Sequence, residues 1–199
     1  MRAPVLVLTA LLALSGCSGG SHPVATPTAT EPAGPSVLAA GKGDLPLQPG
    51  SYLSPDGFVP TLTLAVPAGW TSSHRGDDAF DLSLSEQSVV VALITPTDTR
   101  SGTALARMRK ATTGKVTDVA GTLAGLPATG FEVVGGTGQL VASPSATLAV
   151  DAVPGGHLRV LGTDVDGVPL IAVVSVADGS RWNALIASAQ QLLAEVTPA

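Results

Sequence analysis

The chain has 199 residues, of which 45% are hydrophobic and 13% are charged. This composition excludes a highly charged disordered chain and suits one globular domain with appendages. The chain has ten lysines and arginines and fifteen aspartates and glutamates, so its net charge is −5. This charge makes a broad basic surface and nucleic-acid binding improbable.

The N-terminus has the pattern of a secretory signal. Arg2 supplies a positive charge, and residues 5–14 form an uncharged, mostly apolar run that is too short to cross a bilayer, which takes about 20 residues. The run ends in Leu14-Ser15-Gly16-Cys17, which resembles the bacterial lipobox. The resemblance implies that residues 1–16 are cleaved and that the Cys17 thiol carries a diacylglyceryl group. The alternative is a plain secretory signal with an incidental cysteine.

Residues 17–44 are predicted to form the lipidated Cys17 and a flexible tether. Pro, Ala, Thr, Ser and Gly dominate this stretch, which cannot bury enough apolar surface to offset the entropy of ordering. His22 is interpreted as a solvated bystander. Cleavage leaves nine basic against fifteen acidic residues, so we expect the lipid, and not the net charge, to hold the protein at an anionic membrane.

Residues 45–199 are predicted to form a single globular domain, which is long enough for a hydrophobic core. Asp166-Gly167 predicts the turn of a hairpin between the last two strands. Strands are predicted where apolar residues alternate with polar ones or run without interruption, at residues 61–66, 80–85, 89–94, 116–119, 131–134, 146–153, 158–165 and 168–176.

Two helices are predicted, a short one capped by Ser101 and a long one capped by Ser180. The second carries one apolar stripe, formed by Trp182, Leu185, Ile186, Ala189, Leu192, Leu193 and Val196. Because this stripe must pack on a sheet, the predicted fold class is α+β: a mostly antiparallel sheet with a short helix and a long C-terminal amphipathic helix packed on it.

The order of short motifs adds a family resemblance. Phe58-Val59-Pro60 leads into a strand that ends in Val66-Pro67-Ala68-Gly69-Trp70, and Gly125-Leu126-Pro127 precedes Phe131-Glu132-Val133. With the Asp166-Gly167 hairpin and a helix rich in Gln and Leu, residues 58–197 resemble small extracytoplasmic lipoproteins of high-GC Gram-positive bacteria with a PsbP-like α/β sandwich. The resemblance implies a fold and a location in the cell envelope. It implies no activity, because these motifs are features of the fold and not of a catalytic site.

The sequence predicts no catalytic residue. There is no G-x-S-x-G motif, and the domain offers two histidines as a base, His74 and His157, whereas a serine hydrolase needs nucleophile, base and acid together. His74 lies near Asp77, Asp78 and Asp81, but residues 71–78 are interpreted as a solvated polar loop. His157 is interpreted as an exposed turn residue.

No metal and no cofactor is predicted either. Asp164-x-Asp166-Gly167 resembles the opening of a calcium loop, but its twelfth residue is Ser175 in an apolar strand, where a bidentate Glu is needed. Asp77, Asp78 and Asp81 are interpreted as a solvated acidic loop and not a cation site. The single Cys17 excludes a cysteine-rich zinc site.

Two tryptophans complete the candidates. Trp182 is predicted to pack in the core, whereas Trp70 either closes the core or lines a ligand groove, which makes it the candidate ligand-binding residue. The leading hypothesis is a membrane-anchored, extracytoplasmic, non-catalytic binding or accessory module of the cell envelope, with an envelope protein or small ligand as partner and no nucleic acid. The alternatives are a carrier of lipid or acyl ligands and a hydrolase that uses His74.

Overall fold

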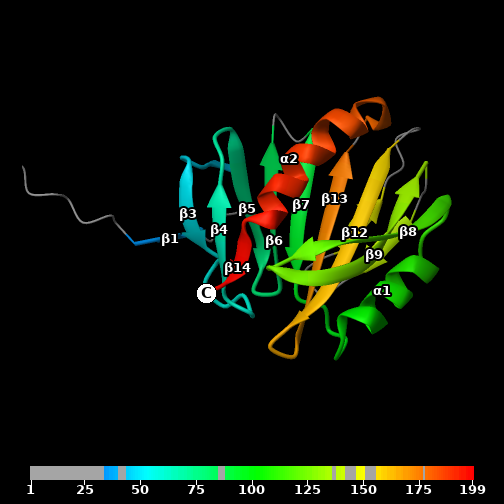
Figure 1. Cartoon of the computed structure of the whole chain (residues 1–199), viewed down its shortest axis with the longest axis horizontal. Helices are drawn as coiled ribbons and strands as arrows, with labels where there is room; N and C mark the ends of the chain where they lie inside the picture. Colours follow the sequence, from blue (N-terminus) through cyan, green and yellow to red (C-terminus); the bar gives the residue numbers. More distant parts are fainter. Residues whose placement is uncertain are drawn as a thin grey trace, which may run out of the picture. The chain divides into compact units, whose positions relative to one another are not determined.

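A computed structural model describes residues 34–39, 44–84, 88–135, 138–141, 147–150, 156–176 and 178–199 of the chain (Figure 1). Gly34–Ala199 form one compact unit. The predicted signal, Cys17 and most of the tether therefore lie outside the described residues. None of the described helices is long and apolar enough to span a membrane.

An eight-stranded sheet forms the centre of the domain, and all of its neighbouring strands are antiparallel. In spatial order it consists of β2 (Leu45–Pro46), β5 (Trp70–Gly76), β6 (Ala79–Leu84), β7 (Val89–Ile94), β13 (Val168–Val176), β12 (His157–Val165), β9 (Leu126–Val134) and β8 (Lys115–Leu123). The last strand, β8, lies at the edge of the sheet and contains the predicted strand at residues 116–119.

A second sheet has four strands in the order β1 (Ser36–Val37), β3 (Gly50–Leu53), β4 (Leu62–Val66) and β14 (Val196–Pro198), with β1 parallel to β3. A separate antiparallel pair joins β10 (Gly138–Val141) and β11 (Thr147–Val150). The helices are α1 (Ser101–Lys110), the 3₁₀ turn η1 (Gly179–Arg181) and α2 (Trp182–Ala194). The mixed α+β class with a mostly antiparallel sheet is confirmed.

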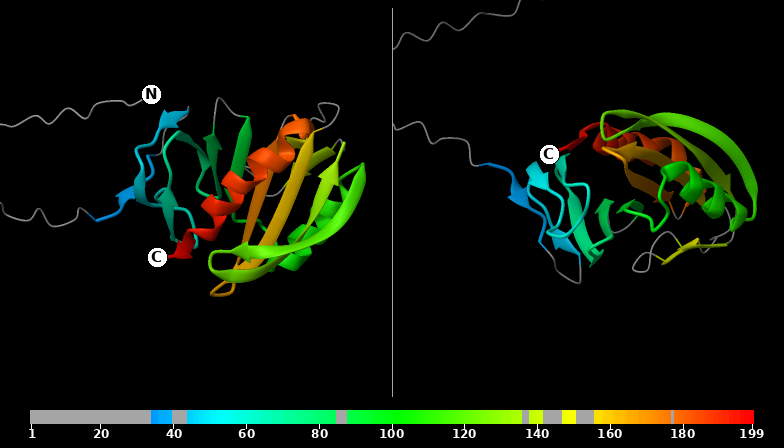
Figure 2. Two further views of the ribbon diagram at one scale, coloured as in Figure 1. Left: turned by 45° about the horizontal axis from the view of Figure 1, so that its top comes forward. Right: turned by 90° about the horizontal axis from the view of Figure 1, so that it is seen from below.

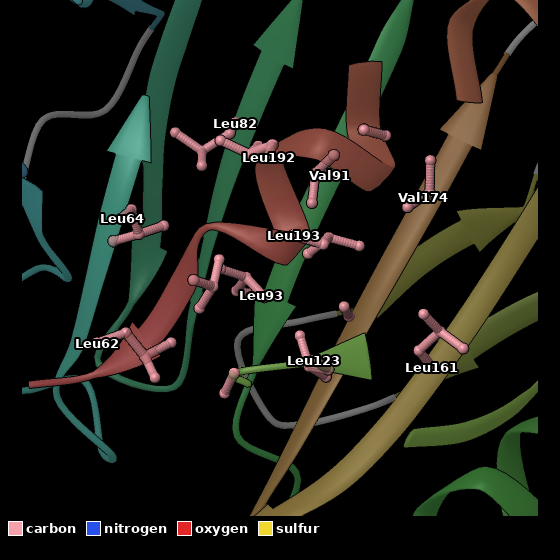
Figure 3. Packing of buried hydrophobic residues seen from close by; sticks show 14 of the residues in the cluster. Leu62, Leu64, Leu82, Val91, Leu93, Leu123, Leu161, Val174, Leu192 and Leu193 are labelled. Atoms are coloured by element: carbon pink, nitrogen blue, oxygen red, sulfur yellow. The ribbon is translucent and has the colours of Figure 1, made fainter. Parts of the chain in front are cut away.

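The two faces of the large sheet are covered by different elements. Helix α2 and the four-stranded sheet lie on one face, and α1 lies on the other (Figure 2). In Figure 3, Leu192 and Leu193 of α2 reach into a cluster with Leu82, Val91 and Leu93 of the sheet. On the opposite face, Met108 of α1 belongs to a smaller buried cluster. Each face is thus closed by apolar side chains, as burial of apolar surface requires.

The predicted strands with the strongest apolar signal occur as expected. Residues 89–94 and 168–176 match β7 and β13, and the Asp166-Gly167 turn has both residues at positive φ, 50° and 82°. A two-residue hairpin turn with this geometry matches the twist of its strands. The predicted hairpin between the last two strands is therefore confirmed.

The helix ends differ from the prediction. Ser101 is the first helical residue. Its backbone N–H donates to Oδ1 of Asp164, a residue near the end of β12, and the two atoms are 2.8 Å apart. Ser180 lies inside η1, whose cap is the Asp178 carboxylate. Helix α2 ends at Ala194, and Val196 enters β14 opposite Leu64. The predicted apolar stripe of the helix includes Val196 because this residue is buried, but it is buried in strand β14 and not in the helix.

The packed part of the chain begins earlier than residue 45. Ser36 and Val37 pair with β3, and Leu38 is buried, with its backbone N–H bonded to the Leu53 carbonyl. The sequence does not predict this strand, because two residues among Ala, Pro and Gly give no periodicity and their partners Tyr52 and Leu53 lie sixteen residues further along the chain.

Candidate binding surface

The structure places His74 in a strand and separates it from Asp81. The predicted loop 71–78 is wrong, because residues 70–76 form β5 and only Asp77 and Asp78 make the turn to β6. His74 lies directly opposite Phe80 on β6, whereas Asp81 lies opposite Ser73. Neighbouring residues of a strand point to opposite faces. His74 and Asp81 are therefore separated by the sheet, and the His74 Nε2 atom is buried without a hydrogen-bond partner.

Asp81 is held in an ion pair. The Arg75 Nε and Nη2 atoms both lie 2.6 Å from Asp81 Oδ2. Burial raises the pKa of the Asp81 carboxyl, the Arg75 guanidinium opposes this shift, and the nearby Asp44 charge adds to it. A carboxyl with a shifted pKa is a candidate functional group only where it lies in a cleft that a substrate can reach. This one is occupied by Arg75, so it is a paired buried acid.

Trp70 belongs to the core. Its side chain is 2% exposed and lies in the larger apolar cluster, where Leu84 is its cross-strand neighbour. The interpretation of Trp70 as a groove residue is wrong, because too little of its ring reaches the surface to contact a ligand. The tight positive-φ turn at Gly69 turns the chain from β4 into β5 and sets the indole inward.

Trp182 organises a cluster that the sequence did not reveal. His157 packs edge-on against its indole, with ring centroids 4.7 Å apart, and the Arg159 guanidinium lies 5.6 Å from the ring centroid. Arg159 also donates from Nε and Nη2 to Glu132 Oε2, at 3.1 and 2.8 Å. His157 is therefore half-buried against an aromatic ring, and the prediction of an exposed turn residue is wrong.

These residues lie in two rows across three strands. Lys115, Val134 and His157 are cross-strand partners in one row. The next row consists of Thr117, Glu132 and Arg159. Cross-strand partners share a face, so the six side chains form one continuous area, which we call the two-row patch.

The two-row patch is accessible and chemically mixed. Val134 is 39% exposed, Lys115 and Thr117 are exposed, and the Arg159 and Glu132 side chains keep 18% and 19% of their exposure. It combines an apolar side chain, a hydroxyl and charges of both signs. Such an area can donate and accept hydrogen bonds to a polar partner.

Metal chemistry has no support in the described ranges. Among the residues that the structure describes, no group of three or more His, Cys, Asp or Glu side chains could hold a metal ion. Asp164 is engaged with the first turn of α1, and Asp166 forms the hairpin turn. Asp77 and Asp78 form the turn between β5 and β6.

Comparison with known proteins adds little. No protein-family model matches the chain, and no curated protein matches it. Among solved structures, the chain is similar to the crystal structure of LpqN, involved in cell envelope biogenesis of Mycobacterium tuberculosis, with a TM-score of 0.32 and 12% identity. The similarity covers 82% of this chain and 88% of that chain. A likeness at this level carries no argument, and the resemblance to PsbP-like lipoproteins stays a prediction.

Proposed function

We propose that this protein is a lipid-anchored, extracytoplasmic lipoprotein whose domain is a non-catalytic binding module of the cell envelope. Residues 1–16 act as its signal peptide and Cys17 as its anchor. The lipobox-like sequence at residues 14–17 supports the anchoring. Two acyl chains hold a protein stably at a membrane, because each buried CH₂ contributes about 0.8 kcal/mol.

The two-row patch carries the binding role in this proposal. Around it, the charged and aromatic side chains are organised by contacts to one another, and Arg159 is fixed by both Glu132 and Trp182. Fixed polar groups lose little entropy when a partner binds. An envelope protein segment with mixed polar and apolar side chains is the partner class that this surface suits best.

The anchor is tested by replacing Cys17. In Cys17→Ala the thiol that would be acylated is absent, so the protein is expected to leave the membrane fraction, whereas Ser18→Ala stays in it. Fractionation of cells followed by immunoblotting measures this directly. Retention of Cys17→Ala at the level of the parent would contradict the anchoring.

The binding surface is tested by site-specific photocross-linking in the envelope. A photoreactive amino acid at Thr117 lies in the two-row patch, and one at Gln190 lies on the exposed side of α2. A discrete adduct is expected from position 117 and none from position 190. Equal adducts from both positions, or none from 117, would contradict the assignment of the patch.

The non-catalytic role is tested by activity. A broad esterase and glycosidase screen of the parent and of His74→Ala is expected to show no turnover in either protein. Turnover in the parent that His74→Ala abolishes would replace the proposed role with a hydrolase.

A further inference from the structure

The basic residues are concentrated in one short segment. Five of the ten lysines and arginines occur between Arg100 and Lys115, and residues 99–117 contain no acidic residue. Counting the flanking Asp98 and Asp118, residues 98–118 carry five basic against two acidic residues, a local charge of +3. The rest of residues 34–199 carries four basic against twelve acidic residues, a charge of −8. The net charge of the chain therefore hides a basic region.

The structure places four of these cations along α1. Ser101, Ala104, Leu105 and Met108 face the sheet and are buried, whereas Arg107, Arg109 and Lys110 are exposed. Arg100 is exposed at the N-cap position. We call Arg100, Arg107, Arg109 and Lys110 the basic helix surface.

The exposed residues between these cations are small. Gly102, Thr103 and Ala106 are all exposed and have side chains shorter than those of the four cations. A helix of ten residues is about 15 Å long. The small side chains therefore allow the outer side of α1 to approach a flat surface closely.

Helix stability does not explain the whole surface. Cations in the last turn suit the helix dipole, but a cation at the N-terminal end opposes it. Arg100 occupies that end, and the first turn has no acidic residue. Among the described residues, Arg107 pairs with Asp98 and Arg109 with the exposed Asp118, and no ion pair involves Arg100 or Lys110. Part of the positive charge is thus available to a partner.

We propose that the basic helix surface binds the anionic phospholipid headgroups of the membrane to which the protein is anchored. Screening limits electrostatic attraction to about 8 Å at physiological ionic strength, so a membrane that meets α1 senses the charges along this helix and not the net charge of the chain. Each Lys or Arg close to an anionic surface contributes about 1 kcal/mol. The acidic remainder of the domain is repelled, which orients α1 toward the bilayer.

The connection to the anchor allows this contact. Cys17 and Gly34 are seventeen positions apart in the sequence, and a chain of that length reaches about 55 Å when extended. Strand β1 and helix α1 lie at opposite ends of the domain (Figure 1, Figure 2). A chain of this reach permits the end that carries α1 to touch the membrane while β1 stays connected to the lipid.

The test uses the chain from residue 18, which retains every described residue and lacks the anchor, so its outcome is independent of lipidation at Cys17. Co-sedimentation with vesicles compares phosphatidylcholine alone with phosphatidylcholine containing about one third phosphatidylglycerol. Binding is expected for the anionic vesicles only, and it is expected to disappear at high salt. Equal binding to both vesicle types, or binding to neither, would overturn the proposal.

Matched variants assign the binding to α1. The triple variant Arg100→Gln, Arg109→Gln, Lys110→Gln retains Arg107. Arg107 is kept because the Asp98 side chain with which it pairs is only 14% exposed, and its loss could destabilise the fold. The partition coefficient of the triple variant on anionic vesicles is expected to fall about 100-fold, roughly fivefold for each charge. Lys110→Gln alone is expected to lose about fivefold and the exposed control Arg181→Gln almost nothing. Thermal melting confirms that the variants are folded. Unchanged binding by the folded triple variant would overturn the proposal.

Discussion

The two faces of the eight-stranded sheet are covered in different ways. The face under α2 and the four-stranded sheet is closed by large apolar side chains such as Trp70, Leu64 and Leu192. The face under α1 is closed by a ten-residue helix whose outer side is basic. Stability and surface chemistry are thus separable in this domain. Substitutions beneath α2 should change the free energy of unfolding, and substitutions on the outer side of α1 should change interactions.

The largest loss of stability is expected beneath α2. Leu192→Ala removes a fully buried side chain from the larger cluster, which typically lowers the free energy of unfolding by about 2–5 kcal/mol. Its neighbour Gln191 is exposed, so Gln191→Ala should change the same quantity by less than about 0.5 kcal/mol. Urea denaturation of both variants measures the difference. Similar midpoints for the two would contradict the packing of α2 on the sheet.

A smaller loss is expected where two strands approach too closely for a side chain. A Cβ atom at Gly130 would lie 1.8 Å from the Val160 carbonyl oxygen, whereas one at Gly102 in α1 would meet nothing within 4 Å. Gly130→Ala should therefore cost about 3 kcal/mol, and Gly102→Ala should stabilise by about 0.5 kcal/mol. Chemical denaturation compares them, and an unaffected Gly130→Ala would show that β9 and β12 lie farther apart.

The contact between α1 and the β12–β13 hairpin should contribute about 1 kcal/mol. Asp164→Ala removes the acceptor of the Ser101 N–H bond at the first turn of α1, and losing such a cap costs about 0.5–2 kcal/mol. Asp164→Asn keeps an oxygen acceptor and should recover most of the loss. If the alanine and asparagine variants melt at the same temperature, the hydrogen bond has no such role.

The smallest effect is expected at Asp81 and depends on pH. Burial raises the pKa of this carboxyl above its ordinary value of 3.8, so the folded state binds the proton more tightly than the unfolded state. The parent is therefore stabilised as pH falls through the folded pKa toward 3.8, and this contribution is lost as pH rises. Asp81→Asn lacks the titration. Its stability relative to the parent should increase from pH 4 to pH 7, and a pH-independent difference in urea unfolding would contradict the shift.

The sequence predicts the elements whose signal is local. Residues 89–94 form a strand because they are apolar without interruption, and the Asp166-Gly167 turn follows from the positive φ that both residues tolerate. The sequence predicts a loop in place of strand β5 because Thr71, Ser72 and Ser73 are polar. Its strand structure comes from pairing with β6 and from the burial of Trp70 and Ser72.

The two-row patch could not be predicted because its parts are distant in sequence. Glu132 and Arg159 are 27 residues apart, and Trp182 joins them only through the packing of α2. Only His157 gave a weak indication in the sequence, because a histidine at the start of an apolar strand is expected to pack one side of its ring against neighbouring side chains. The basic segment at residues 100–115, by contrast, is visible in the sequence. Only the structure shows that its apolar residues turn inward and its cations outward.

The central claim, a lipid anchor on Cys17, is tested most directly by the intact mass of the protein extracted from membranes. The account predicts an N-terminus at Cys17 that carries a thioether-linked diacylglyceryl group. A polypeptide that retains residues 1–16, or one that begins at Cys17 with an unmodified thiol, would contradict it.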